Sequence, residues 1–132
     1  MAVVSRDASV PPPLGELEAE VMEQLWRRGE ATVRSVLEAI NATAEKARAY
    51  TTVMTVMGNL DRKGLLTRRR EGKTDVYTPV TSREDYHRAR ARAEAGAMVG
   101  RYGNAALMAF AREMDRLEPE QRRQLRRLAR DG

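Results

Sequence analysis

Hydroxyl and basic side chains gather between Lys46 and Lys73 of this 132-residue chain. That stretch holds 8 Lys and Arg against 2 Asp and Glu, whereas residues 1–45 hold 4 against 8 and residues 74–132 hold 12 against 9. Basic side chains bind the phosphates of nucleic acids, and hydroxyl groups reach both phosphates and base edges. The stretch therefore indicates a surface that binds double-stranded DNA.

Three threonines are the candidates for reading a DNA sequence. Thr51, Thr52 and Thr55 lie opposite the apolar stripe of a helical pattern that begins near Tyr50. Threonine is a weak helix former, but its hydroxyl and methyl groups suit base edges in the major groove. Gly58, on the same helix, leaves room for close approach of a backbone. The other DNA-binding candidates are Lys46, Arg48, Asn59, Arg62, Lys63, Arg68, Arg70 and Lys73.

Two further helices are predicted ahead of the threonine helix. Apolar residues at intervals of three and four run from Leu14 and stop at Gly29, and Thr32 is a plausible N-cap for a second helix that ends near Asn41. The threonine helix then follows and ends at Lys63 and Gly64.

A hairpin is predicted directly after this helix. Two β-prone runs, residues 65–70 and 74–80, flank a turn at residues 71–73 that contains Gly72. Three helices followed by a basic hairpin are typical of a winged helix-turn-helix. We therefore expect a mainly α fold of the α+β winged helix-turn-helix class over residues 14–81, after a disordered tail at residues 1–13 that contains three consecutive prolines.

Residues 82–132 are predicted to be entirely helical. Ser82 and Asp85 resemble a capping box that opens a long helix, and Asn104 and Pro119 open two more. Their apolar stripes are narrow, so we expect them to pack against a second copy of the chain, as two-fold DNA half-sites also favour. The expected interface residues are Ala93, Ala97, Leu107, Phe110, Met114, Leu117, Leu125 and Leu128.

Composition argues against several other classes of protein. There is no cysteine, and the one histidine, His87, lies in an Arg-rich helix without a carboxylate or serine arranged around it. There is also no Gly-rich phosphate loop, so we expect no catalytic residues, no metal ligands and no cofactor. The chain lacks an apolar run of membrane-spanning length and a signal-peptide pattern, so a cytoplasmic protein without membrane insertion is expected.

Three stretches resemble the penicillinase repressor family of BlaI-, MecI- and CopY-type regulators. They read LGELEAEVMEQLW, YTTVMTVMGNLDRKGLL and REGKTDVYTPV, and the resemblance extends over residues 14–131. It implies a homodimeric transcriptional repressor that occludes a promoter at a palindromic operator and controls β-lactamase or cell-envelope genes. It also implies that a membrane sensor protease releases the DNA by cleaving the repressor in its C-terminal helices.

Three departures from the family pattern bear on regulation and binding. The absence of cysteine excludes the usual copper-sensing mode. Ala109 stands before Phe110 where cleavable members have Asn, which puts cleavage at that bond in doubt. Asn59 stands where the family commonly has Arg. Two alternatives stay open: a regulator released by a directly bound small molecule, and a winged helix used only for protein–protein assembly, against which the basic stretch argues.

Overall fold

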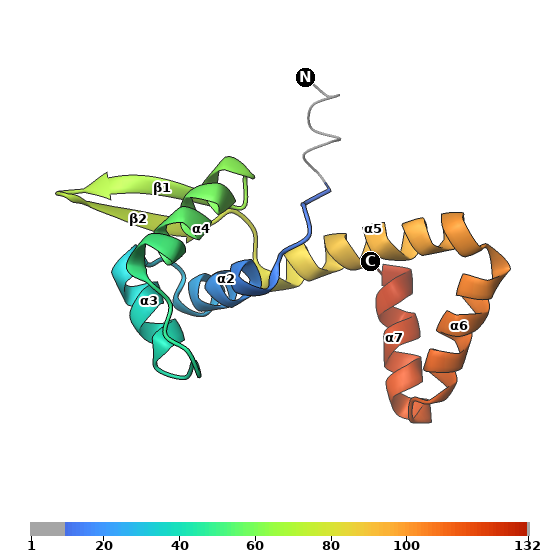
Figure 1. Ribbon diagram of the computed structural model, residues 1–132. Coiled ribbons are helices and arrows are strands. Elements are labelled where there is room, and N and C mark those ends of the chain that lie inside the picture. Colours follow the sequence, from blue (N-terminus) through green and yellow to red (C-terminus); the bar gives the residue numbers. More distant parts are fainter. Residues whose placement is uncertain (1–9, 132) are drawn as a thin grey trace, which may run out of the picture. The chain divides into compact units, whose positions relative to one another are not determined.

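The computed structural model describes residues 10–131, which form two compact units that divide between Arg90 and Ala91. Figure 1 shows the helices and the hairpin in chain order. The elements are α2 (Glu16–Arg28), α3 (Val33–Asn41), α4 (Tyr50–Arg62), β1 (Leu66–Glu71), β2 (Thr74–Pro79), α5 (Arg83–Tyr102), α6 (Asn104–Asp115) and α7 (Pro119–Asp131). We call the first unit the winged unit and the second the C-terminal unit.

Local capping fixes where the first two helices begin. At the start of α2, the Glu18 carboxylate accepts a hydrogen bond from the Gly15 backbone N–H at 2.8 Å. At the start of α3, the Thr32 hydroxyl accepts from the Ser35 N–H, and the Ser35 hydroxyl accepts from the Thr32 N–H, each at 3.1 Å. These side chains satisfy N–H groups that have no partner within the helix.

The hairpin is tighter than the sequence pattern predicted. Glu71 pairs with Thr74, so the turn consists of Gly72 and Lys73 alone. Gly72 has φ +63°, a conformation that glycine adopts without steric cost and that a two-residue hairpin turn requires at its first position. Ala31, between α2 and α3, adds a short bridge: its N–H and C=O exchange hydrogen bonds with Tyr77 of β2 at 3.0 and 2.9 Å.

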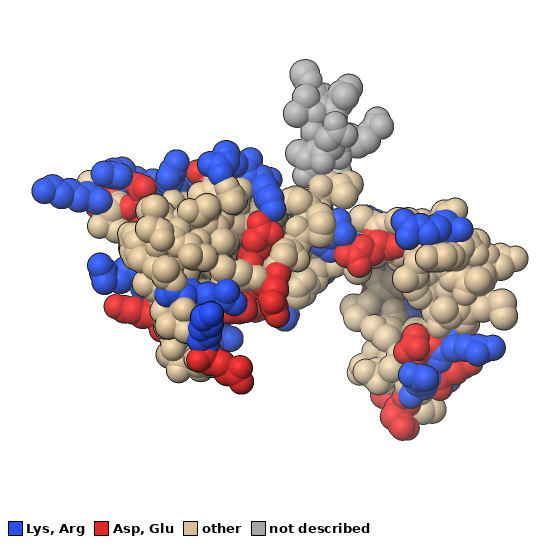
Figure 2. Space-filling view, in the orientation of Figure 1, with Lys and Arg blue, Asp and Glu red and all other residues tan. Residues whose placement is uncertain are grey.

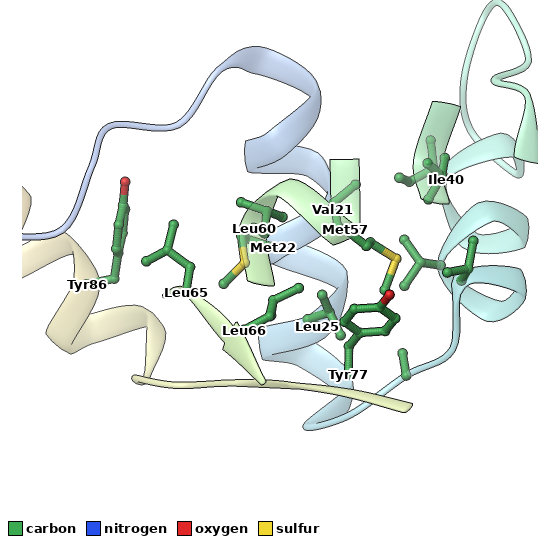
Figure 3. Close-up of a cluster of buried hydrophobic side chains, with 14 residues drawn as sticks. Val21, Met22, Leu25, Ile40, Met57, Leu60, Leu65, Leu66, Tyr77 and Tyr86 are labelled. Atoms are coloured by element: carbon green, nitrogen blue, oxygen red, sulfur yellow. The ribbon is translucent and has the colours of Figure 1, made fainter. Parts of the chain in front are cut away.

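A single apolar core holds the winged unit together. Figure 3 shows side chains from α2, α3, α4, both strands and the start of α5 meeting in one cluster. Met22, Leu25, Met57, Leu60 and Leu66 are its largest fully buried side chains. This packing explains why a two-stranded hairpin, unstable alone, is stable here.

The start of α5 belongs to the winged unit. Tyr86 lies in the core, its hydroxyl donates to the Pro12 carbonyl at 2.6 Å, and its ring lies 5.5 Å from that of Trp26. The Trp26 indole N–H donates to the Thr81 carbonyl at 3.0 Å. Most of the tail predicted to be disordered, residues 1–9, lies outside the described residues. Its last part, residues 10–13, runs beside α5, where Arg90 donates to the Pro11 carbonyl at 3.1 Å.

The C-terminal unit is helical but almost without a core of its own. Among residues 91–131, only Ala106 is buried. The turn between α6 and α7 is held by Arg122, whose guanidinium donates to the carbonyls of Met114 and Leu117 at 3.3 and 2.9 Å. The prediction of a mainly helical chain with one two-stranded hairpin is confirmed.

Candidate nucleic-acid interface

The threonine face of α4 is exposed. Val53, Met57 and Leu60 anchor the helix because all three are fully buried. Thr51, Thr52 and Thr55 lie on the solvent side, as the helical spacing predicted. The helix therefore presents hydroxyl and methyl groups on a rigid support, which is the arrangement that base readout in a major groove needs.

The loop that leads into α4 is fixed by Asn41. Its side-chain amide donates to the Arg48 carbonyl at 3.1 Å, and its carbonyl oxygen accepts from the Arg48 N–H at 2.8 Å. Lys46 and Arg48 are exposed, and neither forms an ion pair within residues 10–131. Two predicted phosphate ligands are thus free, on a loop whose path is set by a residue that sequence reasoning missed.

The cations at the C-terminal end of α4 have partners. Arg62 donates to the side-chain oxygen of Asn59, and Lys63 forms an ion pair with Glu18 of α2 at 2.6 Å. The hydrogen bond from the Gly15 N–H lowers the pKa of Glu18 most, and the hydrogen bond from Lys63 lowers it further. The Lys63 ammonium is therefore shared with a carboxylate that a phosphate would have to replace.

The hairpin arginines form ion pairs with carboxylates of the same unit. Figure 2 shows Lys and Arg side chains following the hairpin to its tip, with carboxylates beside some of them. Arg69 donates to Glu30 at 3.0 Å and to Glu71 at 2.6 Å. These hydrogen bonds raise the pKa of Arg69, and the hydrogen bond from Arg69 lowers the pKa of Glu30.

The two arginines predicted to hold phosphates are also paired. Arg68 lies 3.3 Å from Asp61 and 3.6 Å from Asp75, and Arg70 lies 3.1 Å from Asp75. The hydrogen bond from Arg68 to the Tyr77 hydroxyl, at 3.3 Å, is the first cause of the raised pKa of Arg68. Lys73, at the turn, is exposed and has no ion pair in the described part of the chain. On the hairpin, Lys73 is therefore the cation most available to an external phosphate.

The residues predicted to form a dimer interface divide into two groups. Ala97, Leu107, Leu125 and Leu128 are exposed, and Ala93, Phe110, Met114 and Leu117 are half-buried. Exposed apolar residues of this size on α6 and α7 are typical of surfaces that associate with another protein, so the dimer interface stays a prediction.

The bond between Ala109 and Phe110, the possible cleavage region, lies in the middle of α6. Proteolytic nicking is favoured at exposed loop tips, so cleavage at this bond would require α6 to open locally.

Other kinds of site find little support within residues 10–131. His87 contacts the rings of Trp26 and Tyr86, with centroids 5.8 and 5.9 Å away, and therefore belongs to an aromatic cluster. No three acidic or histidine side chains of the described residues are arranged to hold a metal ion. Over the same residues, no helix has the length and apolarity needed to cross a membrane.

Comparison with known proteins agrees with this geometry. The model of the penicillinase repressor family matches residues 14–131. The transcriptional regulator BlaI of Mycobacterium tuberculosis is 45% identical over 73 residues, which are 54% of this chain and 51% of that protein. The penicillinase repressor of Bacillus licheniformis is 29% identical over 75 residues, 57% of each chain. The matched stretch thus spans about half the length of these relatives.

A solved structure is similar over the same region. The solution structure of the DNA-binding domain of the repressor BlaI aligns with a TM-score of 0.50 and 29% identity, covering 57% of this chain and 89% of that one. The winged helix-turn-helix predicted from the sequence is confirmed by this likeness and by the helices and hairpin described above. With the family model matching nearly all of the described residues, the chain belongs to the penicillinase repressor family.

Proposed function

We propose that this chain is a transcriptional repressor that binds double-stranded operator DNA as a homodimer and acts by covering a promoter. The observation that carries the proposal is the exposed threonine face of α4, set on a buried apolar stripe. A merely solvated helix face would more often carry Glu and Lys, which are stronger helix formers than Thr. We assign Thr51, Thr52 and Thr55 to base readout in the major groove.

Phosphate contacts surround this face. Lys46 and Arg48 precede this face on the loop that Asn41 holds, and Lys73 lies at the tip of the hairpin. All three are exposed and have no ion pair among the described residues. Such contacts supply affinity and salt dependence, whereas the threonines supply selectivity. The similarity to a DNA-binding domain of a repressor supports DNA binding by the winged unit.

The C-terminal unit is proposed to supply the two-fold symmetry. Leu125 and Leu128 of α7 are exposed at 41% and 65%, and pairing with a second copy would bury them. A homodimer would present two copies of α4 to successive half-sites of a palindromic operator. Release by a membrane sensor protease that cleaves beside Phe110 remains a prediction of the family resemblance.

Binding to the promoter region of the protein's own gene tests the proposal. We expect wild-type protein to bind a duplex of that region more tightly than a random duplex of equal length, measured by fluorescence anisotropy. Thr55→Ala should lower affinity for the promoter duplex by about 1–3 kcal/mol and leave random-duplex binding little changed.

The matched control is Thr67→Ala, at an exposed position of β1. It removes the same hydroxyl and methyl groups outside α4 and should leave promoter selectivity at the wild-type value. An equal loss on both duplexes for Thr55→Ala would contradict its assignment to base readout. Absence of any duplex binding by the wild-type protein would contradict the proposed function itself.

A further inference from the structure

A groove of about 550 Å³ lies in the winged unit between α4 and the hairpin. Its walls come from four places: the start of α3, one edge of α4, the hairpin turn and the paired strands. The lining residues that matter here are Arg34, Tyr50, Met54, Gly58, Lys73 and Tyr77. Arg34, Tyr50 and Met54 are not among the residues that the sequence patterns assigned to a site.

Two of the three cations that line this groove have no carboxylate partner in residues 10–131. Arg34 and Lys73 are both exposed. The other charged lining residues, Arg68 and Asp75, lie 3.6 Å apart and offset each other's charge. The groove therefore carries two uncompensated positive charges, one from α3 and one from the hairpin turn, which suits a polyanion that passes between them.

Tyr50 holds the Arg34 guanidinium near the groove. The Arg34 Cζ atom lies 6.0 Å from the centroid of the Tyr50 ring, within the range of a cation–π contact. This contact orients the guanidinium without neutralising its charge, so Arg34 stays available to a phosphate.

The α4 wall of the groove is apolar and partly bare. Tyr50 and Met54 are exposed at 43% and 44%, although methionine is usually buried. Gly58 has no side chain, and a Cβ atom placed there would meet nothing within 4 Å. A sugar–phosphate strand offers charged oxygens to the two cations and an apolar sugar face to such a wall.

We propose that this groove holds the phosphodiester backbone of one DNA strand, with Arg34 and Lys73 each binding a phosphate and Tyr50 positioning the Arg34 guanidinium. The proposal rests on the proposed DNA-binding function and adds a second contact zone beside the threonine face. The backbone would enter between α3 and the hairpin turn while Thr51 and Thr55 face the bases.

The salt dependence of binding to a random-sequence duplex tests the two phosphate contacts. Arg34→Ala and Lys73→Ala should each reduce the slope of log K against log salt by about 1. Both variants should weaken binding to the promoter and random duplexes by the same factor. The matched control is Arg28→Ala, at an exposed position at the end of α2 that does not line the groove, and it should keep the wild-type slope.

The role of Tyr50 needs a readout of its own. Tyr50→Leu should lower the salt slope as Arg34→Ala does, and adding it to Arg34→Ala should change the slope no further. Tyr50→Phe keeps the ring and should restore the wild-type slope. Thermal unfolding of each Tyr50 and Arg34 variant, monitored by circular dichroism, should match that of the wild type because the Tyr50 and Arg34 side chains are exposed.

The outcomes separate this inference from the function on which it rests. If wild-type protein binds the promoter duplex but Arg34→Ala and Lys73→Ala keep the wild-type slope, the groove does not hold a phosphate backbone. An equal change of the salt slope in Arg28→Ala would mean that the slope responds to the net charge of the protein and not to the groove, and it would overturn the assignment as well. If the wild-type protein binds neither duplex, the proposed function fails first.

Discussion

The two units of this chain place their large apolar side chains in opposite ways. In the winged unit, Met22, Leu25, Met57 and Leu60 are fully buried, and the threonine face of α4 is polar. In the C-terminal unit, only Ala106 is buried among residues 91–131, and the surface exposes Met98, Tyr102, Leu107, Met108, Leu125 and Leu128.

The difference shows which kind of partner each surface suits. A helix such as α4 can give one face to its own core and leave the other for a polar, charged partner. The helix α7 has no buried residue in this chain, so its apolar stripe is the face left for association. An apolar stripe without a core to cover it suits a protein partner, and a second copy of the chain is the partner proposed above.

The largest expected effect tests whether the winged unit carries its own stability. Leu25→Ala should lower the free energy of unfolding by about 2–5 kcal/mol, because it leaves a cavity in a fully packed site. Urea denaturation followed by circular dichroism measures the change. Thr51→Ala, at an exposed site of the same unit, should stay within about 0.5 kcal/mol of wild type. A small effect of Leu25→Ala would remove the contrast between the units.

The next effect tests the C-terminal unit. Leu128→Asp should weaken self-association at least about tenfold, an energy near 1.4 kcal/mol, because it puts a carboxylate into an apolar interface. Sedimentation velocity over a concentration series measures the shift towards monomer. Arg126→Asp introduces the same carboxylate about half a helical turn away and should leave the association much less affected. Dimers that survive Leu128→Asp would place the interface elsewhere.

Local sequence signals were sufficient to predict where helices of both units begin and end. Thr32 and Ser82 mark helix starts by capping, and the structure has both caps, with the Asp85 N–H donating to the Ser82 hydroxyl at 3.0 Å. Gly64, with φ +84°, follows the end of α4, where only glycine is free of strain. These signals act over three or four residues, so a single sequence contains them in full.

Pairings between distant segments were not predictable in this way. Two partners of the wing arginines lie outside the hairpin: Glu30 is 39 residues from Arg69, and Asp61, which pairs with Arg68, belongs to the preceding helix. Arg70 pairs with Asp75 across the hairpin, which depends on the strand register. The Ala31 bridge to Tyr77 and the groove beside Arg34 also arise only when the hairpin folds back over α2 and α4. The threonine face was predictable because it depends on one helix, whereas the choice of phosphate-binding cations depends on tertiary neighbours.

A smaller effect separates folding from binding on α4. Gly58→Ala should stabilise the winged unit by about 0.5–1 kcal/mol, because alanine favours helix and its Cβ meets open space. The same change should weaken binding to both duplexes, since the added methyl group occupies the wall along which the DNA backbone is proposed to pass. Gly100→Ala on α5, also open within 4 Å, is the control that should leave binding unchanged. Tighter or equal DNA binding by Gly58→Ala would mean that no backbone approaches this wall.

The last effect, similar to or smaller than that of Gly58→Ala, concerns Glu18, whose pKa is lowered first by the Gly15 N–H at the start of α2 and then by Lys63 at the end of α4. Because the pKa of Glu18 is lowered from its ordinary value of 4.5, its carboxylate stabilises the fold above that pH and loses this contribution as pH falls through the folded-state pKa. Glu18→Gln should therefore be less stable than wild type by up to about 1 kcal/mol near neutral pH, with the gap closing in acid. Chemical denaturation at a series of pH values measures it. Glu120→Gln, whose partner Arg123 is three residues away on α7, should change stability by only a few tenths of a kcal/mol, about 0.2–0.5. A gap for Glu18→Gln that stays constant into acid would show that the charge of Glu18 does not stabilise the winged unit through Gly15 and Lys63.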